Sequence, residues 1–263
     1  MCFVQTFFTI GFYYLNIPFK EGVILLGNQM IFKRYEMKYM ITMEQLEAIK
    51  EEFEKHMSLD KYGKSTICSL YFDTPDFRLI RRSIEKPIYK EKLRVRSYGV
   101  AKPDSHVFVE LKKKYKKVVY KRRIDLKEED AMLYLSTKSA PVNSQIAKEI
   151  DYALDFYKEL SPAMLLTYDR EAYYGKDDPD FRVTFDTNVL WRDYDLSLTK
   201  GIYGNPILDD QYVLMEVKTA DAVPLWLVKL LSEHHIYKTS FSKYGTAYKI
   251  LCTQTQKGNL IYA

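Results

Sequence analysis

Basic side chains recur at every second residue in short segments that could place them side by side. In EKLRVRSY, Lys92, Arg94 and Arg96 alternate with apolar residues, and in YKRRID the same spacing separates Lys121 from Arg123. Arginine contacts phosphate through two parallel N–H donors, and lysine supplies a point charge. Crowding arginines on neighbouring strands is unfavourable unless a polyanion lies among them. The spacing therefore indicates a binding site for an anion that carries several charges.

The basic charge of the chain is concentrated rather than spread. The sequence has 40 Lys and Arg against 35 Asp and Glu, a net charge of +5, and the stretch 110–123, ELKKKYKKVVYKRR, alone holds eight basic residues and one acid. Proteins that coat nucleic acid usually spread cations over a face or a tail, and no aromatic-plus-glycine RNA-recognition motif is present. We therefore expect one anion site and no nucleic-acid partner. The stretch itself predicts a hairpin in which Glu110, Lys112, Lys121 and Arg123 face the site, while residues 113–117 form most of a solvated connection.

Alternation of charged and apolar residues predicts at least six β-strands, each with one charged and one apolar face. Two arrangements fit this pattern. An antiparallel sheet could bury its apolar face and expose its charged face to water, or a closed barrel could turn its charged faces inward while helices cover the apolar faces outside. Carboxylates that stand two residues from one or two cations, often arginine, favour the barrel. The segments are FKRYEMKYMI (32–41), EKLRVRSY (91–98), HVFVELKKKY (106–115), VVYKRRID (118–125), FRVTFD (181–186) and LMEVKT (214–219).

Three segments have the 3.6-residue period of an amphipathic helix. Residues 42–57 open with Thr42 and carry Gln45 three positions on, which is the pattern of a capping box. Residues 144–160 and 222–236 are the other two segments. No long linker or repeat interrupts residues 30–255, so we expect one domain there, followed by a tail at 256–263.

The first 29 residues form a separate apolar segment with no charge before Lys20. Its length suits a marginal membrane anchor. Alternatively, Met30 is the true start, because the strand pattern begins directly after it. The three cysteines, Cys2, Cys68 and Cys252, lie far apart without metal-binding spacing, which favours a reducing compartment. We therefore expect a cytoplasmic protein, located at the inner face of the cell membrane if the segment is an anchor.

Nine short motifs occur in the order seen in VTC-domain proteins, and the chain resembles that family over about residues 30–252. VTC-domain proteins belong to the triphosphate tunnel metalloenzymes and include the polyphosphate polymerase subunit of the eukaryotic vacuolar transporter chaperone complex. The resemblance implies an α+β fold built on a closed antiparallel eight-stranded β-barrel, with helices packed on its outside. The motifs are RYEMKY (34–39), YFDT (71–74), KLRVR (92–96), VELK (109–112), YKRR (120–123), YDR (168–170), FRVTFD (181–186), MEVK (215–218) and FSKYGTAY (241–248).

The resemblance also assigns roles to residues at these motif positions. It implies a divalent metal, Mn2+ or Mg2+, held mainly by Glu216 with Glu36 and Glu110 as helpers, and an oxygen-only ligand set suits these ions. The YFDT motif is expected to be structural. The implied catalytic cations are Lys38, Arg94, Arg96, Lys121, Arg170, Lys218 and Lys243. The implied phosphate-binding residues are Lys112, Arg123, Arg182 and Ser242.

Together these roles imply a polyphosphate polymerase, which adds the terminal phosphoryl group of ATP to a growing polyphosphate chain and releases ADP. One alternative is a hydrolase of the same fold that acts on tripolyphosphate or a nucleoside triphosphate. Hydrolases of the superfamily carry ExExK in the first strand, and Arg34 replaces the first acid here, which favours transfer. The other alternative is a non-catalytic module that binds polyphosphate or another polyanion. The expected partners are ATP and inorganic polyphosphate, with a membrane protein if the product is moved across a membrane.

Overall fold

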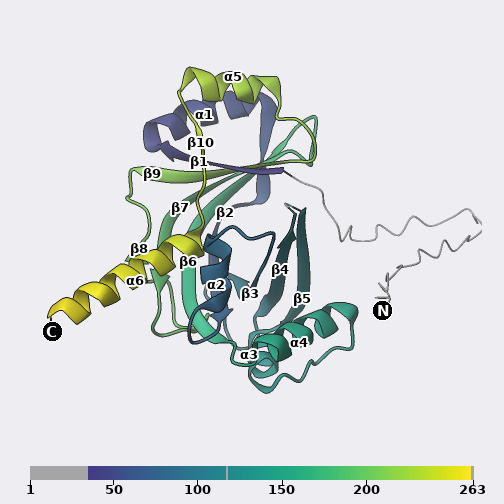
Figure 1. Ribbon diagram of the computed structural model, residues 1–263. Helices are drawn as coiled ribbons and strands as arrows, with labels where there is room; N and C mark the ends of the chain where they lie inside the picture. Colours follow the sequence, from purple (N-terminus) through teal and green to yellow (C-terminus); the bar gives the residue numbers. More distant parts are fainter. Residues whose placement is uncertain (1–34, 117, 262–263) are drawn as a thin grey trace, which may run out of the picture.

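The computed structural model of the chain describes residues 35–116 and 118–261 (Figure 1). The apolar segment 1–29 lies outside these residues, as does Arg34, so both interpretations of the segment stay predictions. No helix in the described ranges is long and apolar enough to span a membrane. Residues 256–261, expected to be a tail, continue the last helix.

Ten strands form a single sheet in the described part of the chain, and every pairing in it is antiparallel. Its order is β10-β1-β9-β7-β6-β2-β3-β4-β5, with β8 paired to β7. The strands are β1 (Tyr35–Thr42), β2 (Met57–Asp73), β3 (Tyr89–Tyr98), β4 (His106–Tyr115), β5 (Val118–Lys127), β6 (Ser161–Gly175), β7 (Arg182–Arg192), β8 (Asn205–Pro206), β9 (Tyr212–Thr219) and β10 (Lys238–Thr239). The helices are α1 (Met43–His56), α2 (Arg78–Ile84), α3 (Glu128–Thr137), α4 (Gln145–Tyr157), α5 (Leu225–Glu233) and α6 (Lys243–Ile261).

The prediction of a closed eight-stranded barrel is wrong, because the two ends of this sheet do not pair with each other. The free edge of β1 pairs instead with β10, where Lys38 lies opposite Thr239. The sheet is nevertheless strongly curled. Lys112 Nζ on β4 lies 3.8 Å from Glu36 Oε2 on β1, although five strands separate β4 from β1 in the sheet. The fold is therefore tunnel-like but open, with a concave face on which these two side chains meet.

Helices cover the opposite, convex face, as the alternation of apolar residues predicts. Ile41 of β1 and Val217 of β9 belong to one buried cluster with Ile49 of α1 and Leu227 of α5. A second cluster joins β3, β4 and β5 to α3 and α4, which lie together at the other end of the molecule (Figure 1). Burial of these apolar faces is the main force that holds each helix pair on the sheet. The charged residues that alternate with these apolar ones, such as Lys38 of β1 and Glu216 of β9, are therefore turned to the concave face.

The three predicted helices are confirmed as α1, α4 and α5. The capping box is present in α1, because Gln45 N–H donates to Thr42 Oγ1 (3.2 Å) and Thr42 N–H donates to Gln45 Oε1 (3.0 Å). The helix α4 begins after Ser144, whose side chain accepts from the N–H of Ala147. The helix α5 begins after Pro224. The helices α2, α3 and α6 were not predicted.

The helices α2 and α6 pack against each other and against the sheet. Tyr71 and Trp191 of the sheet belong to a buried cluster with Ile80 of α2 and Tyr244 of α6. Asp73, which is fully buried, accepts hydrogen bonds from Ile80 N–H (3.0 Å) and the Tyr244 hydroxyl (2.9 Å). This carboxylate joins both helices to the end of β2, so a structural role for the YFDT motif is supported. It also fixes the first turn of α6 beside the charged strands.

Candidate functional site

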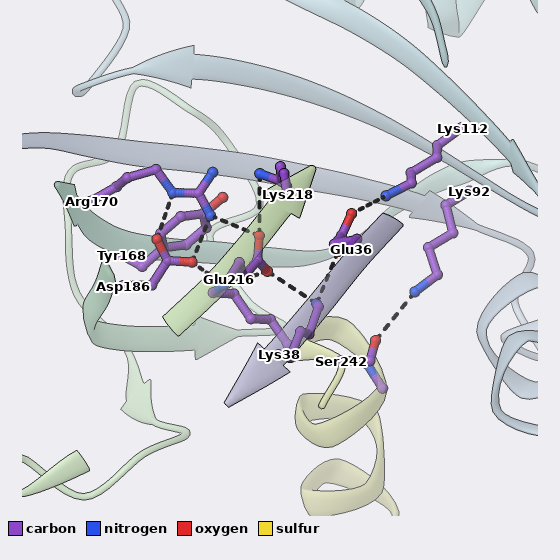
Figure 2. A network of polar contacts seen from close by, with 12 residues as sticks. Glu36, Lys38, Lys92, Lys112, Tyr168, Arg170, Asp186, Glu216, Lys218 and Ser242 are labelled. Atoms are coloured by element: carbon purple, nitrogen blue, oxygen red, sulfur yellow. Dashed lines mark hydrogen bonds and ion pairs between the residues drawn. The ribbon is translucent and has the colours of Figure 1, made fainter. Parts of the chain in front are cut away.

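Four carboxylates on the concave face are each surrounded by basic side chains. Figure 2 shows Glu36, Asp186 and Glu216 with their basic neighbours. They come from four different strands: Glu36 from β1, Glu110 from β4, Asp186 from β7 and Glu216 from β9. Because alternate residues of a strand share a face, Lys38 lies beside Glu36 and Lys218 lies beside Glu216. The site is therefore assembled from short ExK and RxR patterns that the curl of the sheet brings together.

Glu216 accepts ion pairs from four basic residues. Lys38 Nζ lies 3.0 Å from Oε1 and Lys243 Nζ 3.9 Å from it, while Arg170 Nη2 and Lys218 Nζ each lie 3.5 Å from Oε2. Burial raises the pKa of Glu216, but the charges of Lys218, Lys243, Lys38 and Arg170 outweigh burial and hold this pKa well below its usual value. The carboxylate is therefore ionised at neutral pH.

Asp186 was not among the predicted site residues, yet it is fully buried at the centre of this group. Arg170 donates to its two oxygens from Nε (2.5 Å) and Nη2 (2.6 Å), and the Lys243 ammonium also donates to it. Burial raises the pKa of Asp186, whereas Lys243 and Arg170 lower it by more. Parity in FRVTFD placed Asp186 on the charged face, which is the signal that could have identified it. Its contact with Lys243 depends on the position of α6 and has no sequence signal.

Glu110 forms a second group with basic residues of β3 and β5. Arg94 donates to its Oε2 from Nε (2.8 Å), Lys121 Nζ lies 2.6 Å from Oε1, and Arg96 Nε lies 4.0 Å from Oε2. Burial raises the pKa of Glu110, but Arg94, Arg96 and Lys121 lower it far more. Arg94 also donates to the hydroxyl of Tyr71 (2.9 Å). A buried carboxylate thus holds Arg94 in a fixed orientation and lies near Arg96.

Glu36 connects the group around Glu216 to β4. Its Oε1 lies 3.6 Å from Lys38 Nζ and its Oε2 lies 3.8 Å from Lys112 Nζ. Burial raises the pKa of Glu36, but Lys112 and Lys38 lower it by more, so it too is ionised. Its side chain is 32% exposed, which leaves its oxygens accessible to a ligand on the concave face.

Cations outnumber these carboxylates, and the surplus perturbs neighbouring groups. Burial opposes ionisation of Tyr71, yet Arg94, Lys92 and Arg96 lower its pKa to about 8. Burial lowers the pKa of Lys92 to about 8, although the nearby Tyr71 opposes this, and further lysines add to the shift. Burial likewise lowers the pKa of Lys218 to about 8, against the attraction of Glu216. The local potential is therefore strongly positive and suits a polyanion.

The structure brings most of the predicted residues together, including Ser242, whose Oγ accepts from the Gly245 N–H (3.2 Å) and from Lys92 Nζ (3.3 Å). Two predicted phosphate-binding residues, Arg123 and Arg182, lie opposite Glu110 and Lys218 in the strand register, but their side chains have no recorded ion pair with the four carboxylates. The guanidinium of Arg123 stacks on the Phe108 ring, 3.3 Å from its centroid. The nearest recorded acid to Arg182, which is 50% exposed, is Asp60 at 4.0 Å.

The predicted hairpin is present, but its connection is shorter than expected. Strand β4 continues to Tyr115, so Lys113 and Lys114 belong to the strand. Lys113 and Arg122 point to the convex side and pair with Glu149 of α4 at 3.1 and 3.0 Å. The expectation that residues 113–117 form most of a solvated connection is therefore wrong. An acid on a distant helix explains the difference, and hairpin patterning does not reveal such a partner.

The four carboxylates do not by themselves form a complete metal-binding site. Among residues 35–116 and 118–261 no group of three or more His, Cys, Asp or Glu side chains could hold a metal ion. Glu36 and Glu216 nevertheless lie close enough that the charge of Glu216 raises the pKa of Glu36. One or two carboxylates completed by phosphate oxygens is a common way of binding Mg2+. The donors thus fit a divalent ion that binds together with a phosphorylated ligand.

The fold resembles that of a solved structure, a candidate adenylate cyclase from Bacillus halodurans, with a TM-score of 0.52 and 14% identity over 81% of this chain and 96% of that chain. A candidate adenylyl cyclase from Hippeastrum with a dominant triphosphatase activity has a TM-score of 0.48 and 14% identity over 80% and 92% of the two chains. A candidate adenylate cyclase from Vibrio parahaemolyticus has a TM-score of 0.45 and 11% identity over 84% and 99%. Only the first of these TM-scores exceeds 0.5, so the similarity of fold rests on the Bacillus halodurans structure. The protein thus belongs to a class of folds built on a curled antiparallel sheet, and here the concave face of the sheet is rich in cations.

The sequence matches the VTC domain over residues 33–252, and the chain belongs to the VTC-domain family. The resemblance inferred from the nine motifs is confirmed. A comparison with curated proteins gave no match. Membership of this family supports a function that involves polyphosphate or triphosphate.

Proposed function

We propose that the protein is a polyphosphate polymerase that transfers the terminal phosphoryl group of ATP to inorganic polyphosphate and releases ADP. The observation that carries this proposal is the surplus of cations around ionised carboxylates on the concave face. The carboxylates are Glu36, Glu110, Asp186 and Glu216, and the basic residues among them are Lys38, Lys92, Arg94, Arg96, Lys112, Lys121, Arg170, Lys218 and Lys243. Donor and acceptor are both polyanions, so a site for both needs such a surplus.

In this reaction the acceptor's terminal oxygen bonds to the γ-phosphorus while the bond from that phosphorus to the β–γ bridging oxygen breaks, and ADP leaves with the electron pair. The acceptor oxygen is already anionic at neutral pH, so no general base is required. The work of the chain is to hold the two partners in line and to stabilise charge. Arg94 and Arg170 are suited to this because Glu110 and Asp186 fix their planes before the substrate binds.

A divalent ion would be held by Glu216 and Glu36 with phosphate oxygens, and it would neutralise charge on the transferring phosphoryl group. Lys38 lies between these two carboxylates, 3.0 Å from Glu216 Oε1 and 3.6 Å from Glu36 Oε1. Its ammonium would remain beside the phosphate oxygens. A cytoplasmic location and a membrane-protein partner for the product stay predictions from the sequence.

Incubation of the purified protein with ATP and Mn2+ or Mg2+, with and without a polyphosphate primer, tests the proposal. Long chains on a gel together with ADP are the expected products. Orthophosphate without chains would instead identify a triphosphate hydrolase, and binding without turnover under all conditions would identify a polyanion-binding module.

A substitution of Glu216 separates these outcomes further. Glu216→Gln removes the charge that holds four cations, so turnover should be lost while tripolyphosphate binding, measured by calorimetry, is kept. The matched control is Glu233→Gln, at an exposed position on α5, and it should leave both unchanged. A Glu216→Gln variant that polymerises at the wild-type rate would contradict the assigned role.

A further inference from the structure

Four lysines form two directly opposed pairs on the concave face of β3 and β4. In the register of these strands, Lys92 lies opposite Lys112 and Lys90 lies opposite Lys114. All four side chains are half-buried. Like charges directly opposite each other on antiparallel strands destabilise the sheet. The arrangement is therefore unfavourable for the protein alone and suggests a ligand that neutralises it.

These lysines differ from the other cations of the concave face in their partners. The arginines around Glu110 and Asp186 are paired with carboxylates, whereas Lys92 donates to Ser242 Oγ (3.3 Å) and Lys90 to the Ser83 carbonyl oxygen (3.0 Å). Burial lowers the pKa of Lys90, and the charges of Lys114, Lys86 and Lys112 lower it further. The cations thus influence one another without an acid between them.

The lysine pairs are continuous with the site described above. Glu36 lies within 3.8 Å of Lys112 and 3.6 Å of Lys38, so the row begins where the carboxylate-containing group ends. Figure 2 shows Lys112 and Lys92 on the side of Glu36 that is opposite to Arg170 and Asp186. From there the row continues through the pair Lys90 and Lys114. It ends at Lys86, which is exposed beside the end of α2.

We propose that Lys112, Lys92, Lys90, Lys114 and Lys86 form the path along which a polyphosphate chain extends away from the reacting groups. This inference rests on the proposed function, because it assumes a linear polyphosphate at the site. Lysine suits such a path, since a flexible point charge can pass from one phosphate to the next, whereas arginine binds one phosphate through a fixed pair of donors. Among the described residues, the recorded ion pair of this row with a carboxylate is that of Lys112 with Glu36, at the end nearest the reacting groups, which fits binding without metal-assisted reaction along the rest of the row.

The test compares the affinity for tripolyphosphate with that for long-chain polyphosphate. The variant is Lys90→Gln with Lys114→Gln, which removes one opposed pair and leaves the carboxylate-containing groups intact. The control is Lys148→Gln with Lys229→Gln, which removes the same charge from exposed positions on α4 and α5. Affinities are measured by calorimetry at several salt concentrations.

The wild type and the control should bind the long chain more tightly than tripolyphosphate. The Lys90 and Lys114 variant should lose about tenfold in affinity for the long chain while its affinity for tripolyphosphate changes less than about twofold. Its salt dependence for the long chain should also be shallower by about 1.4 units, since each of the two lysines, if it neutralises a phosphate of a single strand, contributes ~0.7.

An unchanged preference for the long chain in the variant, or an equal loss for both ligands, would overturn the path. So would a wild type that binds both ligands equally. The yield of polyphosphate from ATP by the wild type tests the proposed function separately. If no polymer forms but the variant still loses its preference for long chains, the proposed function fails and the path stands.

Discussion

The buried carboxylate of Asp186 offers a direct test of how the site is held together. Asn has nearly the same shape as Asp, so Asp186→Asn removes the charge without creating a cavity. The variant leaves the guanidinium of Arg170 and the ammonium of Lys243 without the fully buried anion to which both donate. We expect a large loss of stability in the absence of ligand.

The magnitude follows from the remaining partners. Removing one member of a buried ion pair costs about 3 to 5 kcal/mol. Arg170 and Lys243 retain Glu216 at 3.5 and 3.9 Å, and their side chains are 16% and 10% exposed, so part of this loss is compensated. We therefore expect the free energy of unfolding to fall by about 2 to 4 kcal/mol. Asp125→Asn, at an exposed pair with His106, should cost less than about 1 kcal/mol.

Urea denaturation with and without tripolyphosphate measures the loss of stability and its recovery by the ligand. A phosphate can take the place of the missing carboxylate, so the ligand should stabilise Asp186→Asn more than it stabilises the wild type, by about 1 kcal/mol at equal concentration. A fall in stability of less than about 1 kcal/mol would refute the reasoning that Asp186 is an essential counterion. Equal stabilisation of both proteins by tripolyphosphate would show that the ligand does not reach Arg170 and Lys243.

Three other perturbations follow from the same geometry. Arg96→Ala should lower kcat/KM for polyphosphate synthesis by a factor that corresponds to about 2 to 4 kcal/mol of transition-state stabilisation. The control Arg82→Ala, at an exposed position of α2, should leave kcat/KM unchanged. An unchanged rate for Arg96→Ala would exclude Arg96 from the site. Lys92→Met should raise Tm and weaken polyphosphate binding. Burial lowers the pKa of Lys92 to about 8, so the charged form is disfavoured in the folded protein without ligand. A lower Tm for the variant would contradict this destabilising role of Lys92. Asp186 and Glu216 have lowered pKa values in the folded protein, so they contribute stability above the usual carboxyl pKa of about 4. This stability is lost as the pH falls through the folded-state pKa values. Urea midpoints should therefore drop on acidification below about pH 4.

Much of the local chemistry could be predicted from sequence. A strand has a side-chain period of two, so the charged partners of Arg94 and Lys218 could be assigned to one face before any pairing was known. The helix start at Thr42 was equally local, because both capping hydrogen bonds lie within four residues. Nine motifs in order then identified the family, and the match over residues 33–252 confirms it.

The same periodicity could not determine which side chains meet across the sheet. Arg123 and Arg182 lie opposite Glu110 and Lys218, as parity allows, but the side chain of Arg123 stacks on Phe108 and that of Arg182 reaches Asp60. Asp186 shares parity with Arg182 and was overlooked, because its importance comes from Lys243, which is 57 residues away on an unpredicted helix.

Closure of the sheet was likewise beyond the sequence. Parity fixes the face on which a residue lies, but it does not fix which strand occupies an edge, and the resemblance led us to expect a closed barrel. Here β10 pairs with the edge of β1, so the sheet stays open although Lys112 of β4 still reaches Glu36. Composition and alternation thus determined the chemistry of a cation-rich face. Long-range pairing and helix packing decided which of its residues form one site, since those contacts join segments whose separation along the chain leaves no periodic signal.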